Sequence, residues 1–183
     1  MTTDNARMPA SPIYLISGVP GAGKTTVARA LCARFPQAVH VPGDDLRDLV
    51  VSGFASALDP WTDEHSRQFS LSWRAGASIA RRYADAGFTA VIDDVVRGED
   101  LRRDFYPELR DRPLRKVLLK PTLEMALARS RQRTTKTFDP QRLEAVIARL
   151  YETLANDAPG WLVVDTSQLT IEQTVDAIVH AAW

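Results

Sequence analysis

The eight residues 18–25 restrict this chain more than any other part of its sequence. They read Gly-Val-Pro-Gly-Ala-Gly-Lys-Thr, follow a short apolar run at 13–17 and precede residues with helical apolar spacing. Glycines permit backbone conformations that a Cβ atom forbids, so several N–H groups can converge on one anion. A helix that begins directly after the turn adds the positive end of its dipole. The pattern G-x-x-x-x-G-K-[ST] between a strand and a helix therefore predicts a phosphate-binding loop in an α/β fold.

The loop also predicts which nucleotide and metal the chain binds. Lys24 is expected to reach the β- and γ-phosphates as a catalytic cation, and the Thr25 hydroxyl is expected to ligate Mg²⁺. No Asn-Lys-x-Asp string, the usual reader of guanine, occurs in the sequence, so ATP is the expected nucleotide. The residues expected to contact it from the loop are Gly18, Gly21, Ala22, Gly23, Lys24, Thr25 and Thr26.

Alternating apolar runs and helical segments define the expected fold. Short runs rich in β-branched residues occur at 13–17, 38–41, 88–93, 114–119 and 161–165. Segments with helical spacing separate them, an arrangement typical of a parallel sheet covered by helices on both faces. We expect a five-stranded sheet of order 2-3-1-4-5 in a three-layer α/β sandwich. Residues 12–183 are expected to form one domain behind a flexible N-terminal segment, 1–11.

Three helices are predicted from their ends as well as from their apolar spacing. A helix over 64–86 carries an apolar stripe that ends at Gly87. Asp139 and Pro140 are an N-cap and a first helical residue, which predicts a helix from 140 to about 154. Thr170-Ile-Glu-Gln173 is a capping box that opens the last helix.

Composition excludes several classes of protein. The chain has 183 residues, a single cysteine and equal numbers of basic and acidic side chains, 23 of each. One thiol forms neither an intrachain disulfide nor a zinc cluster. A formal net charge of zero argues against indiscriminate coating of nucleic acid. No run approaches the roughly 20 apolar residues of a membrane span, and the first residues lack the apolar stretch of a secretion signal, so a cytoplasmic location is expected.

Two pairs of aspartates follow the second and third expected strands. Asp44 and Asp45 come after 38–41, and Asp93 and Asp94 stand at the end of the run that begins at 88. Ligands of such sheets bind beyond the carboxyl ends of the strands, so these carboxylates are expected to face the phosphates. Phosphoryl transfer needs one carboxylate to accept the proton of the attacking hydroxyl and another to serve the metal. One of the first pair is also expected to cap the helix that follows at 46–51.

With these residues in view, the chain resembles P-loop kinases related to the kinase domain of polynucleotide 5′-hydroxyl kinase. Chloramphenicol phosphotransferase and zeta-type toxins are similar. The resemblance rests on Asp44-Asp45-Leu46-Arg47 after the second strand and covers most of 13–155. It implies a P-loop kinase-like domain in which Asp44 is the general base and Arg47 contacts the acceptor, often through a phosphate. It also implies that Asp94 lies near the acceptor and the metal, although the sequence leaves open whether Asp93 or Asp94 serves that metal.

A basic segment near 129–139 is similar to the lid of these kinases. It contains Arg129, Arg131 and Arg133 on the end of an expected helix. The resemblance implies an arginine that closes over the transferred phosphate, and Arg133 is the first choice and Arg129 the second. Lids exclude water and add positive charge to the transition state. The alternative is a solvated basic helix end.

The acceptor side is less defined. The segment 51–65 contains three acidic residues and Trp61 but no lysine or arginine, which disfavours a nucleic-acid strand as acceptor. Trp61 either stacks on a cyclic acceptor or packs against the following helix. His65, in the first turn of that helix, is expected at the surface.

These observations lead to one leading function and two alternatives. The leading hypothesis is transfer of the γ-phosphate of Mg²⁺-ATP to a hydroxyl of a small molecule or nucleotide. The alternatives are a polynucleotide 5′-hydroxyl kinase, which would use the same residues, and a nucleotide-gated interaction protein that binds ATP. Acceptor identity, adenine-binding residues, oligomeric state and physiological role do not follow from the sequence.

Overall fold

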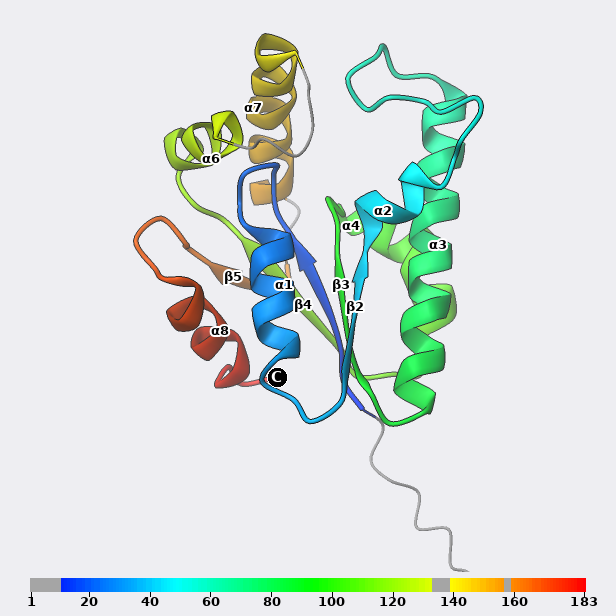
Figure 1. Cartoon of the computed structure of the whole chain (residues 1–183), viewed down its shortest axis with the longest axis vertical. Coiled ribbons are helices and arrows are strands. Elements are labelled where there is room, and N and C mark those ends of the chain that lie inside the picture. The colour runs from blue at the N-terminus through cyan, green and yellow to red at the C-terminus, as the bar shows by residue number, and fades with distance from the viewer. Residues whose placement is uncertain (1–10, 133–138, 157–158) are drawn as a thin grey trace, which may run out of the picture.

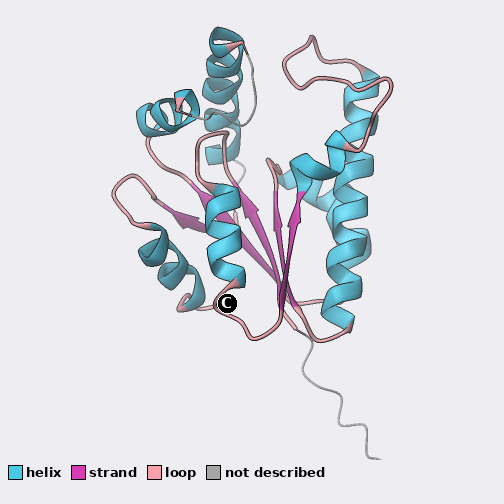
Figure 2. Cartoon of the chain, in the orientation of Figure 1, coloured by secondary structure: helices cyan, strands magenta, loops and turns pink. Residues whose placement is uncertain are grey.

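The chain folds around one parallel β-sheet with helices on both faces (Figures 1 and 2). The computed structural model describes residues 11–132, 139–156 and 159–183. The predicted flexible segment 1–11 lies outside this description except for residue 11. The strands are β1 (Ile13–Ser17), β2 (Ala38–Pro42), β3 (Thr89–Asp93), β4 (Leu114–Leu119) and β5 (Leu162–Val164).

The five strands are parallel in the order β2-β3-β1-β4-β5, which confirms the predicted sheet. Every residue of the central strand β1 is buried, as are those of β3, because helices cover the sheet from both sides. On one face, α1 (Lys24–Cys32) packs on β1 and β3, and α8 (Ile171–Val179) packs on α1 and β5. On the other, α3 (Asp63–Asp85) packs on β1, β2 and β3.

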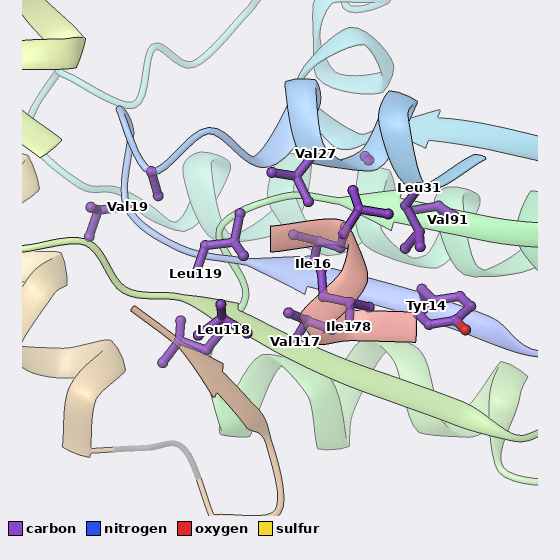
Figure 3. Packing of buried hydrophobic residues seen from close by; sticks show 14 of the residues in the cluster. Tyr14, Ile16, Val19, Val27, Leu31, Val91, Val117, Leu118, Leu119 and Ile178 are labelled. Carbon is purple, nitrogen blue, oxygen red and sulfur yellow. The ribbon is translucent and has the colours of Figure 1, made fainter. Parts of the chain in front are cut away.

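Alternation along the strands divides the apolar core into two clusters. Tyr14, Ile16 and Val91 pack with the side chains of α1 and α8 (Figure 3). Ile13, Leu15 and Ile92, one position away along the same strands, pack instead with α3. Successive side chains of an extended chain point to opposite faces. Asp93, the last residue of β3, therefore shares the face of Val91, and Asp94, which follows the strand, is directed to the other face.

The predicted helix ends are largely confirmed. Asp139 accepts from the backbone N–H groups of 141 and 142 at the start of α7 (Pro140–Asn156), and Thr170 and Gln173 form the capping box of α8. Gly87, with φ of 90°, follows α3. None of the helices in the described parts of the chain is long and apolar enough to cross a membrane.

Two predictions about helix starts are wrong. The helix α2 (Gly43–Asp48) begins three residues before the expected position, so Asp44 and Asp45 lie within its first turn and neither caps it. His65 is buried, not at the surface, because its imidazole forms a capping box with Thr62 and also bonds the carbonyl of Ser56. An imidazole that reaches back in this way replaces the glutamate or glutamine usual at that position.

The connection between β3 and β4 was not predicted as helical. It contains α4 (Gly98–Asp100), a π-helical turn η1 (Leu101–Phe105) and α5 (Tyr106–Leu109). Leu101, Phe105 and Leu109 are buried against the α3 side of the core. The helix α6 (Leu123–Arg131) follows β4, and Thr122 caps it by accepting from the backbone N–H of Met125.

The apolar cluster between α1 and the sheet holds α1 in place, and α1 begins directly after the phosphate loop. Leu31 is fully buried in α1 among residues of β1, β3 and α8 (Figure 3). We expect Leu31→Ala to lower the free energy of unfolding by about 3 kcal/mol, since it removes a buried side chain and leaves a cavity. Urea denaturation measures the change. Arg29→Ala, at an exposed position of the same helix, is the control and should change stability by less than about 0.5 kcal/mol. Equal effects of the two substitutions would contradict this account of the core.

Candidate active site

The phosphate-binding loop connects β1 to α1 at the carboxyl edge of the sheet (Figure 1). Lys24 Nζ donates to the carbonyl oxygens of Gly18 at 2.9 Å and Val19 at 3.4 Å, so the ammonium group lies across the loop. Gly21 adopts φ of 88°, and a Cβ atom there would collide with the carbonyl oxygen of Ala126 in α6. Glycine is therefore required at this point both by backbone conformation and by the close approach of α6.

The hydroxyl of Thr25 is bound to a carboxylate of β3. Thr25 Oγ1 donates to Asp93 Oδ2 at 2.8 Å, and His40 Nε2 lies 2.5 Å from Asp93 Oδ1. The predicted metal residues were Thr25 and Asp94, whereas the carboxylate that the structure brings to Thr25 is that of Asp93. The reason is the alternation of β3, which directs Asp93 to the α1 face of the sheet.

Asp94 lies at the next position and faces the helix α3. Its Oδ2 accepts from Trp73 Nε1 at 2.9 Å, and its Oδ1 accepts from the backbone N–H of Val95 at 2.7 Å. A Cβ atom on Gly43 would collide with this carboxylate, so glycine at the start of α2 lets Asp94 approach the backbone. Burial, and then the nearby charge of Asp44, raises the pKa of Asp94 to about 6, although Arg47 and Lys24 act to lower it.

Arg47 lies close to both acidic side chains and is buried. Its Nη2 is 3.3 Å from Asp44 Oδ1, a long hydrogen bond, and its guanidinium carbon lies 4.1 Å from the centre of the Phe69 ring. Only 8% of the residue is exposed, and among the described residues neither Nε nor Nη1 has a hydrogen-bond partner. Asp44 and Asp94 offset its charge, but the two unused donors favour a further hydrogen-bond acceptor beside them, because a buried polar group without a partner is costly.

One cleft of about 490 Å³ joins these groups. The phosphate loop borders it through Pro20 and Lys24, and α2 and the end of β3 contribute Asp44, Arg47 and Asp94. Apolar and aromatic side chains of two helices form its opposing walls. These are Phe69 and Trp73 of α3 and Leu143, Val146 and Leu150 of α7.

Two further features of the cleft come from the segment before α3 and from the connection after β3. Trp61 borders it, stacks on His65 and Phe69 with ring centres 5.3 and 5.2 Å apart, and remains 50% exposed. It therefore packs against α3 as one alternative predicted and still presents an edge to the cleft. Beyond β3, Arg97 and Arg103 form ion pairs with the buried carboxylate of Asp100, and all three residues line the cleft.

The lid is described only in part. Arg129 Nη2 donates to the carbonyl of Thr166 at 3.0 Å, which ties α6 to the loop after β5, and Arg131 forms an ion pair with Glu144 of α7. Arg133, the first choice for the lid arginine, lies outside the described residues. Arg129 remains a prediction, as does Thr26, which is exposed in the first turn of α1.

Sequence reasoning missed three residues of this site. In the sequence pattern, His40 is one residue of a short apolar strand and Trp73 one residue of the apolar stripe of α3. Gly43 only precedes two aspartates, so nothing in the pattern marks the three as site residues. The signal for His40 was available, since a histidine in the middle of a short half-buried strand needs a polar partner. The partners of Trp73 and Gly43 depend on how α3 and α2 pack against β3. This packing cannot be predicted from a local sequence pattern.

The donor set fits magnesium. Thr25 and Asp93 offer hard oxygen atoms, which Mg²⁺ prefers, and Mg²⁺ takes few protein ligands because it keeps phosphate and water oxygens. No group of three or more histidine, cysteine, aspartate or glutamate side chains suited to a metal occurs in the described ranges.

Fold and site together define a P-loop kinase-like protein, and comparison with known proteins names its family. The AAA_33 model, described as an AAA domain, matches residues 13–156. The chain belongs to this family. No curated protein matches its sequence. The predicted P-loop kinase-like fold is thus confirmed, whereas kinase activity and the specific likeness to polynucleotide kinase stay predictions.

Solved structures share the fold at low sequence identity. Thymidylate kinase from Candida albicans is similar with a TM-score of 0.68 and 14% identity, over 93% of this chain and 90% of that one. A putative kinase from Chloroflexus aurantiacus J-10-fl gives 0.63 and 18%, over 94% and 96%. The tunicamycin resistance protein of Deinococcus radiodurans gives 0.57 and 23%, over 92% and 94%. At these identities the likeness shows the fold alone.

The raised pKa of Asp94 predicts a pH dependence of stability. The ordinary value is 3.8 and the value in the folded chain about 6, so the folded state binds this proton more tightly than the unfolded chain. The free energy of unfolding therefore falls as the pH rises from about 4 through 6. Asp94→Asn removes the buried charge and keeps an acceptor for Trp73. We expect the variant to unfold at a higher temperature than the wild type at about pH 8, and the difference to vanish near pH 3.5.

Thermal denaturation without nucleotide or Mg²⁺ measures this difference. Asp45→Asn, at an exposed position of α2, is the matched control and should give no pH-dependent difference. A gain in stability of Asp94→Asn that is the same at every pH would show that burial of the charge is not its cause.

Proposed function

We propose that the protein is a kinase that transfers the γ-phosphate of ATP to a hydroxyl group of a small acceptor carrying an acidic group. One observation carries the proposal. The cleft that contains Lys24 of the phosphate loop also contains the carboxylates Asp44 and Asp94 beside the buried guanidinium of Arg47. This arrangement offers a phosphate donor site, a base and an anion-binding group within one space.

The proposed reaction is an in-line displacement. The acceptor oxygen forms a bond to the γ-phosphorus while the bond from phosphorus to the β–γ bridging oxygen breaks, and ADP leaves with that electron pair. The proton of the acceptor hydroxyl passes to the carboxylate of Asp44. Mg²⁺, when bound, neutralises charge on the phosphate oxygens. No nucleophilic side chain is required, because catalysis of this kind depends on positioning and on charge stabilisation.

Asp44 suits the role of base better than Asp94. Its side chain is 48% exposed at the mouth of the cleft, where an acceptor can reach it, whereas that of Asp94 is buried and bonded to Trp73. Lys24 and the N–H groups of the loop would hold the phosphates, and Arg129 and Arg133 remain proposed lid residues. Asp94, next to Asp44, would keep that carboxylate and Arg47 in place around the acceptor.

The acceptor class is proposed from the walls of the cleft. The unused donors of Arg47 suit a carboxylate or phosphate of the acceptor, and the stacked rings of Trp61 and Phe69 suit a flat apolar face. A small molecule or nucleotide fits these walls. The polynucleotide alternative is disfavoured by the absence of lysine and arginine from 51–65, and salt-sensitive binding of a short 5′-hydroxyl oligonucleotide would favour it.

Replacement of Asp44 tests the proposed chemistry. We expect Asp44→Asn to lower transfer of labelled γ-phosphate by roughly 10²-fold or more, because the acceptor proton loses its base, with ATP binding unchanged. The acceptor panel contains nucleosides, nucleotides, sugars, sugar acids, antibiotics and 5′-hydroxyl oligonucleotides. Asp45→Asn, one residue along the same helix and exposed, is the control and should keep full activity.

The same assay separates the alternatives. Transfer to an oligonucleotide but to no small molecule would replace the proposed acceptor class by a polynucleotide. ATP hydrolysis that needs no acceptor and is the same in Asp44→Asn would contradict the general base. That result would instead support the nucleotide-gated interaction protein.

Replacement of Arg47 tests whether this residue binds the acceptor. We expect Arg47→Met to raise the KM for an acidic acceptor at least ~10-fold, because a charge-assisted bond is lost. The free energy of unfolding should fall by no more than about 1 kcal/mol, because the ion pair that is removed has a half-exposed partner, Asp44. The flexible apolar side chain still packs on Phe69 and no longer buries a cation. Arg67→Met, at an exposed arginine of α3, is the control. A large loss of stability with KM unchanged would show that Arg47 is structural.

A further inference from the structure

His40 lies on the sheet face that carries the phosphate loop. It pairs in register with Val91 of β3, and Pro42 pairs with Asp93. Paired residues of parallel strands point to the same face, and Val91 belongs to the cluster packed against α1. The neighbouring Val41 belongs to the α3 cluster instead. His40, Asp93 and Thr25 therefore meet on the α1 side of the sheet.

The two oxygens of Asp93 are both engaged, from opposite sides. Oδ2 accepts from the Thr25 hydroxyl at 2.8 Å, and Oδ1 lies 2.5 Å from Nε2 of His40. A carboxylate only accepts hydrogen bonds, so Nε2 is the protonated nitrogen in this contact. The side chain of Asp93 is 5% exposed and that of His40 is 14% exposed, so little water competes with either bond. Rotation of the carboxylate would break both bonds together.

This arrangement determines where the lone pairs of Thr25 point. A hydroxyl has one hydrogen and two lone pairs, and the hydrogen of Thr25 is directed to Asp93. The lone pairs then face away from Asp93, toward the loop and its phosphates. With Asp93 free to turn, the hydroxyl could rotate and direct its hydrogen to that side, where it would repel a cation. The imidazole thus acts on the hydroxyl through the carboxylate.

If residue 40 served only the packing of the sheet, an apolar side chain would be favoured at this position. Val91, the register partner of His40 on β3, is apolar and belongs to the cluster packed against α1, so an apolar side chain at position 40 could join this cluster without the cost of burying a polar ring. Such a side chain would leave Asp93 with one engaged oxygen. A histidine at position 40 therefore contributes more to the orientation of Asp93 than to the packing of the sheet.

We propose that His40 is a positioning residue of the nucleotide and magnesium site, which holds Asp93 so that the Thr25 hydroxyl is oriented to ligate Mg²⁺. The inference rests on the proposed function, because it needs a Mg²⁺-nucleotide at the loop. Residues that orient metal ligands through hydrogen bonds typically change metal affinity by about 10- to 100-fold when they are replaced.

The test measures nucleotide binding, not turnover. The affinity for a non-hydrolysable ATP analogue is measured by calorimetry with Mg²⁺ and again with EDTA. We expect His40→Leu to lose ~10-fold or more of the gain in affinity that Mg²⁺ gives the wild type, with affinity in EDTA unchanged within about twofold. His40→Gln, whose amide nitrogen reaches a position close to that of Nε2, should restore most of the gain.

Two variants control for folding and for loss of a histidine elsewhere. His180→Leu, at the C-cap of α8, should match the wild type. If His40→Leu does not fold, as judged by circular dichroism, His40→Asn takes its place, because its shorter amide is polar but does not reach Asp93.

The outcomes distinguish this inference from the function on which it rests. A wild type that does not bind the analogue, or binds it equally with and without Mg²⁺, would overturn the proposed Mg²⁺-ATP site itself. A wild type with a clear Mg²⁺ gain that His40→Leu retains would overturn the role of His40 alone. Equal losses with Mg²⁺ and with EDTA would also overturn it, since they indicate a structural defect.

Discussion

Burial of strand β1 on both faces is the constraint on which the rest of the structure depends. Helices cover both faces of this strand, so there is no room for a loop above or below it. The chain therefore turns where β1 ends, at the carboxyl edge of the sheet. The phosphate loop forms there, and the parallel direction of the strands brings the ends of β2 and β3 to the same edge. The core thus determines that the phosphate loop, the carboxylates of Asp44 and Asp94 and the guanidinium of Arg47 share one cleft, although they come from distant parts of the sequence.

The alternation of side chains along β3 then directs two adjacent carboxylates to opposite faces of the sheet, where they have different partners. Asp93 faces α1 and is bonded to Thr25, and Asp94 faces α3 and lies beside Asp44 and Arg47. In the proposed kinase, one step along a strand thereby separates the nucleotide side from the acceptor side. The two carboxylates need different partners, and the sheet provides them because its faces are covered by different helices.

The acceptor side carries groups that reduce stability. Arg47 is a buried cation with unused donors, and Asp94 is a buried carboxyl whose pKa is raised to about 6. Both would cost less if they were apolar, so their presence in a well-packed part of the molecule favours a role in binding. Such costs are typical of sites where a ligand, when bound, supplies the missing charge or hydrogen bonds.

The sequence by itself determined the phosphate loop, the five strands and the capped starts of α7 and α8, because these depend on local spacing and on residues with strong conformational preferences. The expected strand order rested on the rules of connection in parallel α/β sheets, not on local spacing. It also identified the acidic pairs and Arg47, but not their partners. Only the tertiary structure decided that Thr25 bonds Asp93, that His40 holds that carboxylate and that Trp73 and Gly43 accommodate Asp94. These contacts join residues up to 68 positions apart in the chain, and their geometry is set by strand register and helix packing.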